Sequence, residues 1–219
     1  MKLFRIFAIA AMAMLAGASA HAGVVLSNIS DRADISATNT NQNTGNRNAM
    51  GFTVGPTNVS LDKITLALFQ IAPPDTINTT VDLYDNNGGN PGNVLASSAQ
   101  TGVSDSNPSG GPKIAFDFAF SGVTLTANTT YFVSPNLGGG SLSWYQSDFG
   151  NPVAVGGSGF TFFGTARNTT ASGGLWVPGG AVHSLEVSVK AEGGAVPEPA
   201  LTSLLCFGGI ALIRRRMKK

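Results

Sequence analysis

Cysteine is almost absent from this sequence, since the only one, Cys206, lies in an apolar run near the C-terminus. Residues 23–195 therefore contain no disulfide bond, and their fold depends on a hydrophobic core. That stretch has the length of one domain and is long enough to bury such a core without covalent cross-links.

Histidine is also scarce, and only His21 and His183 occur. The sequence has no Gly-x-Ser-x-Gly nucleophile elbow and no histidine and cysteine spacing of a zinc site. We therefore expect a protein that is not an enzyme and that uses no metal and no cofactor. The alternative is a catalytic triad assembled in space around His183, which spacing along the chain does not reveal.

A basic patch is missing from the same stretch. Residues 23–195 hold six of the Lys and Arg residues and eleven of the Asp and Glu residues, which gives a net charge of −5. Nucleic acid and anionic membrane surfaces are therefore poor partners, because both are recognised by clustered cations.

The N-terminal residues have the order of features found in a secretory signal peptide. Lys2 and Arg5 come first, residues 6–15 are apolar, and Ala20-His21-Ala22 matches the small-x-small rule for cleavage. We predict that residues 1–22 are removed after Ala22, with Ala20 as the second choice. The alternative is an uncleaved membrane anchor, against which both the short apolar stretch and the cleavage site argue.

A second apolar run, at residues 200–213, lies near the C-terminus. As a helix it would be roughly 21 Å long, against about 30 Å for the hydrocarbon core of a bilayer, so it is a marginal transmembrane helix. A basic cluster follows the run and would keep this end cytoplasmic while the preceding domain is exported. The cluster consists of Arg214, Arg215, Arg216, Lys218 and Lys219. These cations argue against the alternative, a buried core helix.

Val196-Pro197-Glu198-Pro199 stands immediately before this run. Proline fixes its own φ and pushes the preceding residue toward extended conformations, so the motif is a segment that a processing enzyme can grip. A Pro-Glu-Pro motif, a short apolar helix and a terminal basic cluster, in this order over residues 196–219, resemble the PEP-CTERM sorting signal. The resemblance implies transient anchoring in the inner membrane of a Gram-negative bacterium, removal of the tail by an exosortase, and delivery to the cell surface or extracellular matrix. Ala200 departs from the Ser or Thr that such signals often have after the second proline.

Strand and turn residues dominate the part of the chain between these two signals. Gly, Asn, Ser and Thr are abundant, and apolar residues alternate with period 2 rather than 3.6. Ten segments have this pattern, at residues 23–28, 49–54, 61–69, 79–85, 93–99, 113–120, 129–135, 141–147, 159–165 and 183–191. Residues 34–48 are polar and are predicted to be a loop.

The spacing of these segments predicts an all-β fold, with a single β-sandwich or jelly-roll-like domain of about ten strands over residues 23–191. An N-terminal signal helix precedes this domain. A flexible linker at residues 192–195 joins it to a short C-terminal transmembrane helix. In residues 113–120, alternation assigns Ile114, Phe116, Phe118 and Phe120 to the buried face and Asp117 to solvent.

Residues 45–190 resemble a second family. Four segments follow one another in the order found in choice-of-anchor surface domains, namely "GFTVGPTNVSLDKITLAL", "VDLYDNNGGNPGNVL", "LTANTTYFVSP" and "GGLWVPGGAVHSLEV". These domains are β-sandwich modules that occur with several different anchoring tails, PEP-CTERM among them. The resemblance implies a β-sandwich and assigns no catalytic residues.

Three aromatic residues are candidates for ligand contact: Trp144, Tyr145 and Trp176. Sugar-binding β-sandwiches use exposed aromatic side chains, and Gly and Pro near Trp176 indicate a loop or a strand edge. Trp144 and Tyr145 are adjacent, so alternation in a strand predicts that one of them points outward. Core packing is the alternative for all three, because aromatic side chains carry a large apolar area.

Residues 82–93 are rich in side chains with oxygen atoms, with Asp82, Asp85, Asn86, Asn87 and Asn90 beside adjacent glycines. Such a loop suits Ca²⁺, although its spacing differs from that of an EF-hand. The same residues suit a hairpin turn, which needs positive φ angles, and we favour the turn.

These features together predict an exported, non-enzymatic protein of the cell surface or extracellular matrix, handled by the export machinery and by an exosortase. We expect a structural or adhesive role in an extracellular polysaccharide matrix. The alternative is a carbohydrate-binding module that uses exposed aromatics.

Overall fold

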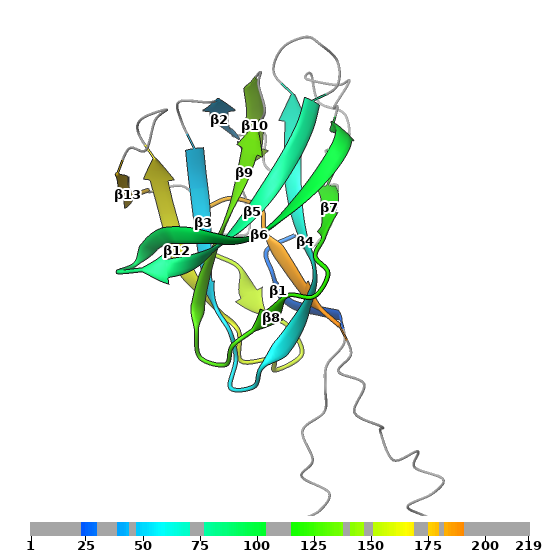
Figure 1. Ribbon diagram of the computed structural model, residues 1–219, viewed down its shortest axis with the longest axis vertical. Helices are drawn as coiled ribbons and strands as arrows, with labels where there is room; N and C mark the ends of the chain where they lie inside the picture. Colours follow the sequence, from blue (N-terminus) through cyan, green and yellow to red (C-terminus); the bar gives the residue numbers. More distant parts are fainter. Residues whose placement is uncertain are drawn as a thin grey trace, which may run out of the picture. The chain divides into compact units, whose positions relative to one another are not determined.

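The structure is a computed structural model that describes part of the chain. The described residues are 23–29, 39–43, 47–70, 77–103, 115–137, 141–146, 151–168, 175–179 and 182–190. They form fourteen strands and no helix, arranged in two antiparallel sheets (Figure 1). The predicted signal peptide, linker and sorting tail lie outside the described residues. Within the described part, no helix has the length and apolar character needed to cross a membrane.

The first sheet is built around the long strand β4 (Val59–Gln70). Its order is β11 (Val153–Ala154), β1 (Gly23–Ser27), β14 (Glu186–Val189), β4, β10 (Ser141–Tyr145) and β2 (Asn39–Asn43). Two further strands, β7 (Ala115–Ala119) and β8 (Thr124–Leu125), also pair with β4. This sheet therefore has eight strands.

The second sheet has six strands. Its order is β13 (Trp176–Pro178), β12 (Thr161–Asn168), β3 (Arg47–Thr53), β9 (Thr130–Leu137), β5 (Ile77–Asn87) and β6 (Asn90–Val103). The long β5–β6 hairpin is visible in Figure 1. The all-β prediction is confirmed, and the arrangement of the two sheets is sandwich-like.

The core lies between the two sheets because each strand turns alternate side chains inward. In β4 the inward set Ile64, Leu66 and Leu68 is fully buried, and it meets side chains of the other sheet in one cluster. In β7 the predicted pattern holds, with Phe118 buried and Asp117 exposed. Buried Phe120 and half-buried Phe116 join the same cluster, whereas Ile114 lies outside the described residues.

Each of the ten predicted segments overlaps a strand, and four short strands of the described residues were not predicted: β2, β8, β11 and β13. The prediction of a loop over residues 34–48 is wrong for two parts of it, because β2 and the start of β3 fall there. β2 is an edge strand that pairs along all of β10. Backbone pairing with one neighbour is enough to form such a strand, so its polar sequence shows no alternation of apolar residues.

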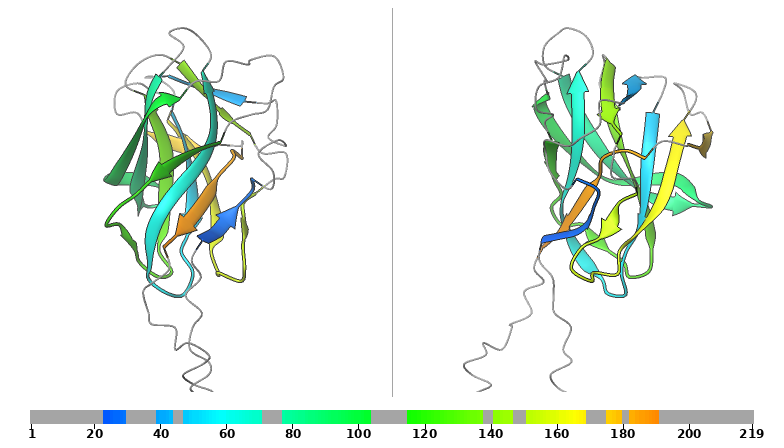
Figure 2. Two further views of the ribbon diagram at one scale, coloured as in Figure 1. Left: turned by 90° about the vertical axis from the view of Figure 1, so that its right-hand side faces the viewer. Right: turned by 180° about the vertical axis from the view of Figure 1, so that it is seen from behind.

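The first and last described strands are neighbours, and Gly23 lies opposite Val189 in the β1–β14 pair. Leu26 and Val187 are also partners, and both are fully buried. Asn28 extends the contact, since its Nδ2 donates to the carbonyl oxygen of His183 at 2.9 Å and its Oδ1 accepts from the Leu185 amide at 2.7 Å. The start of β1 and the end of β14 therefore lie at the same end of the two-sheet unit (Figure 2).

Candidate ligand-binding face

Trp144 and Tyr145 are both buried, so the expectation that one of them points into solvent is wrong. Trp144 has no exposed surface, and its indole nitrogen donates to the carbonyl oxygen of Ser184 at 2.9 Å. Tyr145, which is 5% exposed, packs against Ala67 of β4 on the other side of the sheet. The segment that leads into β14 continues the pairing past the end of β10, since the Ser184 amide donates to the Tyr145 carbonyl oxygen. The two rings lie on opposite faces of the sheet, as alternation predicts, but at this position both faces are covered by other residues.

His183, around which a catalytic triad was the alternative, is packed inside the protein. It is 1% exposed and stacks on Trp144, with ring centroids 4.6 Å apart and planes inclined by 17°. This position fits core packing, and it gives no support to a triad around His183.

Trp176 is the one predicted aromatic candidate that keeps some exposure. It lies on β13, the edge strand next to β12, and is half-buried. Its ring meets the ring of Tyr84 edge-on, with centroids 6.3 Å apart and planes at 73°. Tyr84 belongs to β5, and its neighbours Val81 and Leu83 face the core. Trp176 therefore packs on the outer face of the six-stranded sheet, which is the face turned away from the core.

The strand register brings further aromatic side chains to this outer face. Tyr84 of β5 lies opposite Phe132 of β9, and Phe132 lies opposite Gly51 of β3. The ring of Phe132 meets that of Phe163, from β12, edge-on at 5.6 Å and 89°. Phe163 sits where the β3–β12 register shifts, and it is 46% exposed. Tyr84, Phe132, Phe163 and Trp176 together are called the outer aromatic cluster.

Gly51 makes room for this cluster. A Cβ atom at position 51 would lie 2.8 Å from Cε1 of Phe132 and 3.1 Å from Cβ of Phe163. The shorter distance is below ordinary van der Waals contact, so any side chain here would displace the Phe132 ring. Glycine therefore allows Phe132 to lie close to β3.

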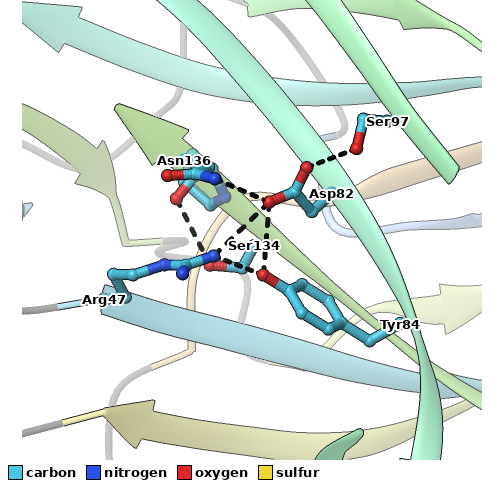
Figure 3. Close-up of polar contacts among 7 residues, drawn as sticks. Arg47, Asp82, Tyr84, Ser97, Ser134 and Asn136 are labelled. Atoms are coloured by element: carbon cyan, nitrogen blue, oxygen red, sulfur yellow. Dashed lines mark hydrogen bonds and ion pairs between the residues drawn. The ribbon is translucent and has the colours of Figure 1, made fainter. Parts of the chain in front are cut away.

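A polar network lies beside the aromatic cluster and is centred on Asp82 (Figure 3). Asp82 is only 4% exposed, although a buried carboxylate needs compensating partners. Its Oδ1 accepts from Ser97 Oγ at 2.6 Å, and its Oδ2 accepts from Asn136 Nδ2 at 2.9 Å, Tyr84 Oη at 3.3 Å and Arg47 Nη2 at 3.5 Å. These donors come from four strands, β3, β5, β6 and β9, which the network ties together.

Tyr84 joins the network to the aromatic cluster. Its hydroxyl accepts a hydrogen bond from Arg47 and donates one to Asp82. Burial raises the pKa of Tyr84 to about 12; the positive charge of Arg47 opposes this rise and the carboxylate of Asp82 adds to it. The phenol is therefore neutral at physiological pH and keeps its proton for Asp82.

Arg47 has bonding capacity that the network does not use. Its guanidinium forms an ion pair with Asp82 and lies 6.0 Å from the centroid of the Tyr84 ring. Its Nε is shielded from solvent and has no hydrogen-bond partner among the described residues. The side chain as a whole is 26% exposed, so part of it reaches the surface.

Residues 82–93, weighed above as a Ca²⁺ loop, form the end of the β5–β6 hairpin. The turn is at Gly88 and Gly89, which have φ values of 62° and 86°, as the turn chemistry predicted. Asp85 Oδ1 accepts a hydrogen bond from the backbone amide of Asn93 at 2.6 Å, and Asp85 Oδ2 accepts one from Asn93 Nδ2 at 3.1 Å. In the described part of the chain, no three His, Cys, Asp or Glu side chains are grouped so that they could hold a metal.

A comparison with protein-family models and with curated proteins finds no match to this chain.

The residues of the outer face could not be grouped from the sequence, because they come from six different strands. One signal was present: in "VDLYD", alternation that places Val81 and Leu83 inward also places Asp82 and Tyr84 together on the opposite face. Their burial depends on Arg47 and Trp176, which are far away in the sequence.

Proposed function

We propose that the chain is an exported, non-enzymatic protein of a bacterial cell surface or extracellular matrix, with a structural or adhesive role. The support comes from the N-terminal signal pattern and from the Pro-Glu-Pro motif, apolar run and basic cluster at residues 196–219. Sorting would follow the PEP-CTERM route, in which an exosortase removes the tail. The body would be a single jelly-roll-like domain of the choice-of-anchor kind.

One observation in the structure carries this proposal: the pairing of Gly23 with Val189. A signal peptide and a sorting tail would leave the domain from adjacent strands at one end. Whether the signal peptide or the sorting tail held the domain near a membrane, the same end of the domain would face that membrane. The outer face of the six-stranded sheet would then stay available to matrix components.

The proposal is tested by replacing the processing motif. The wild-type chain and a Pro197→Ala, Pro199→Ala variant would be produced in a Gram-negative host that has an exosortase and in a matched strain that lacks it. We expect the wild type on the cell surface or in the medium only in the first strain, and the variant to stay in the membrane fraction. Equal release of wild type and variant would contradict the proposal.

A second candidate function, carbohydrate binding, is favoured by the outer face. Trp176 and Phe163 keep exposed surface there, beside a network of hydrogen-bonding side chains. Aromatic rings with a few fixed polar groups are the usual lining of small-molecule and sugar sites. This binding site differs from the one predicted from the sequence, because Trp144 and Tyr145 are buried and take no part in it.

A further inference from the structure

We infer that the outer face of the six-stranded sheet binds a neutral polysaccharide chain, with Phe163 and Trp176 as its stacking surfaces and the Arg47–Asp82 network as its polar support. The inference rests on the second candidate function given above and names its site and its ligand class.

The aromatic part of the site is rigid. Phe163 and Trp176 each stand edge-on against an inner ring, Phe132 and Tyr84 respectively. The inner rings are cross-strand partners, and both are at most 5% exposed. The two outer rings are therefore held by a fixed base while part of their surface faces solvent. Little conformational freedom would be lost when a sugar ring packs on them.

The polar part of the site offers both donors and acceptors, which matches the hydroxyl groups of a sugar. Ser97 is exposed, and because its hydroxyl donates to Asp82, its oxygen can still accept a hydrogen bond. Arg47 is partly open to solvent, and the guanidinium N–H groups that do not bond Asp82 or Tyr84 are the donors it offers to a ligand hydroxyl.

The hairpin tip supplies amide groups next to the most exposed ring. A Cβ atom at Gly89 would lie 4.0 Å from Cζ of Phe163, so the turn approaches this ring. Asn86 and Asn87 on the turn are exposed. Amide side chains beside an aromatic ring provide hydrogen bonds around a stacked sugar.

The charge at the site favours a neutral ligand over an acidic one. The positive charge of Arg47 is balanced by Asp82, and Tyr84 is uncharged. No unbalanced cation is left in the network for a carboxylate or sulfate group. Residues 23–195 carry a net charge of −5, which would repel an anionic polymer.

The inference is tested with the full-length chain, purified from producing cells in a detergent that carries no sugar. Its binding would be measured on an array of neutral oligosaccharides of glucose, mannose, galactose and N-acetylglucosamine, together with alginate and polygalacturonate. The neutral binders would then be titrated against the wild type and against Phe163→Ala and Trp176→Ala. Val153→Ala is the matched control, because Val153 is 64% exposed on β11 of the other sheet.

We expect binding of at least one neutral oligosaccharide, weakened by about tenfold or more in each aromatic variant and unchanged in Val153→Ala. Phe163→Ala should unfold at nearly the wild-type temperature, since the side chain is exposed. Binding of acidic glycans alone, or neutral binding that both aromatic variants retain, would overturn this inference and leave carbohydrate binding standing. If no glycan bound, both this inference and the carbohydrate-binding function would be contradicted. The proposal of surface delivery would be unaffected, because the processing-motif variant tests it separately.

Discussion

Arg47 and Asp82 form an ion pair at 3.5 Å between Nη2 and Oδ2, on the outer face of a sheet whose other face is the core. The side chain of Asp82 is 6% exposed and that of Arg47 is 26% exposed. Removing one member of such a pair leaves the other charge poorly solvated, which usually costs more than the pair contributes.

Asp82→Asn should therefore destabilise the protein by roughly 2–4 kcal/mol, because Arg47 loses its counter-charge in a largely buried setting. The matched control is Asp117→Asn, which breaks an exposed pair with Lys63 at 2.7 Å. That change should cost less than about 1 kcal/mol. Urea unfolding of both variants gives the loss in free energy of unfolding for each. Similar losses for the two would show that the Asp82 network contributes little to stability.

Tyr84 should make the protein less stable at high pH. Its pKa is about 12 in the folded protein, against about 10 in an unfolded chain. Between these values the unfolded chain loses the phenolic proton and the folded protein keeps it, so the free energy of unfolding falls as pH rises. The wild type should lose up to about 2 kcal/mol more than Tyr84→Phe between pH 9.5 and 12. Parallel stability curves for the two proteins would contradict this assignment.

The two tryptophans should respond very differently to truncation. Trp144 has no exposed surface, so Trp144→Ala should cost about 3–5 kcal/mol. Trp176 is half-buried and packs on Tyr84 alone among the described aromatic side chains, so Trp176→Ala should cost about 1–2 kcal/mol. Thermal unfolding of the two variants gives the comparison. Equal losses would make Trp176 a core residue and remove it from the proposed sugar site.

Gly51→Ala should disturb the outer aromatic cluster through Phe132. The added methyl group would lie 2.8 Å from the Phe132 ring, and such overpacking costs roughly 1–3 kcal/mol. In a Phe132→Leu background the ring edge is gone, so the same change at position 51 should cost clearly less. A double-mutant cycle by urea unfolding measures the difference, and strict additivity would show that the two positions do not interact.

Much of the fold could be predicted from alternation of apolar residues, and the reason is visible in single strands. Ile64, Leu66 and Leu68 lie on one face of their strand, and all three are fully buried. Val187 and Val189 likewise share a buried face, with exposures of 0% and 2%. A strand whose one face packs on a core has to repeat with period 2, so its sequence records the register.

The short edge strands could not be predicted in this way. β2 has the sequence NTNQN and pairs only with β10, and β13 has three residues beside β12. Their formation depends on a neighbour that presents free backbone groups, which is a property of the assembled sheet.

The candidate site was predictable only in part. Asp82 and Tyr84 share a face by alternation, yet their burial requires Arg47 and Trp176 from other strands. Trp144 and Tyr145 show the opposite case, since alternation separates them correctly and long-range packing covers both. Contacts between distant segments therefore decide which aromatic residues reach solvent.

The proposed sorting of this chain to the cell surface is tested most directly by the intact mass of the surface-delivered protein. A Gram-negative host with an exosortase would produce the full-length chain, and the protein washed from intact cells would be analysed by mass spectrometry. We predict a polypeptide that begins at Gly23 and ends between residues 196 and 199. Surface material with the mass of a chain that still ends at Lys219 would contradict the account.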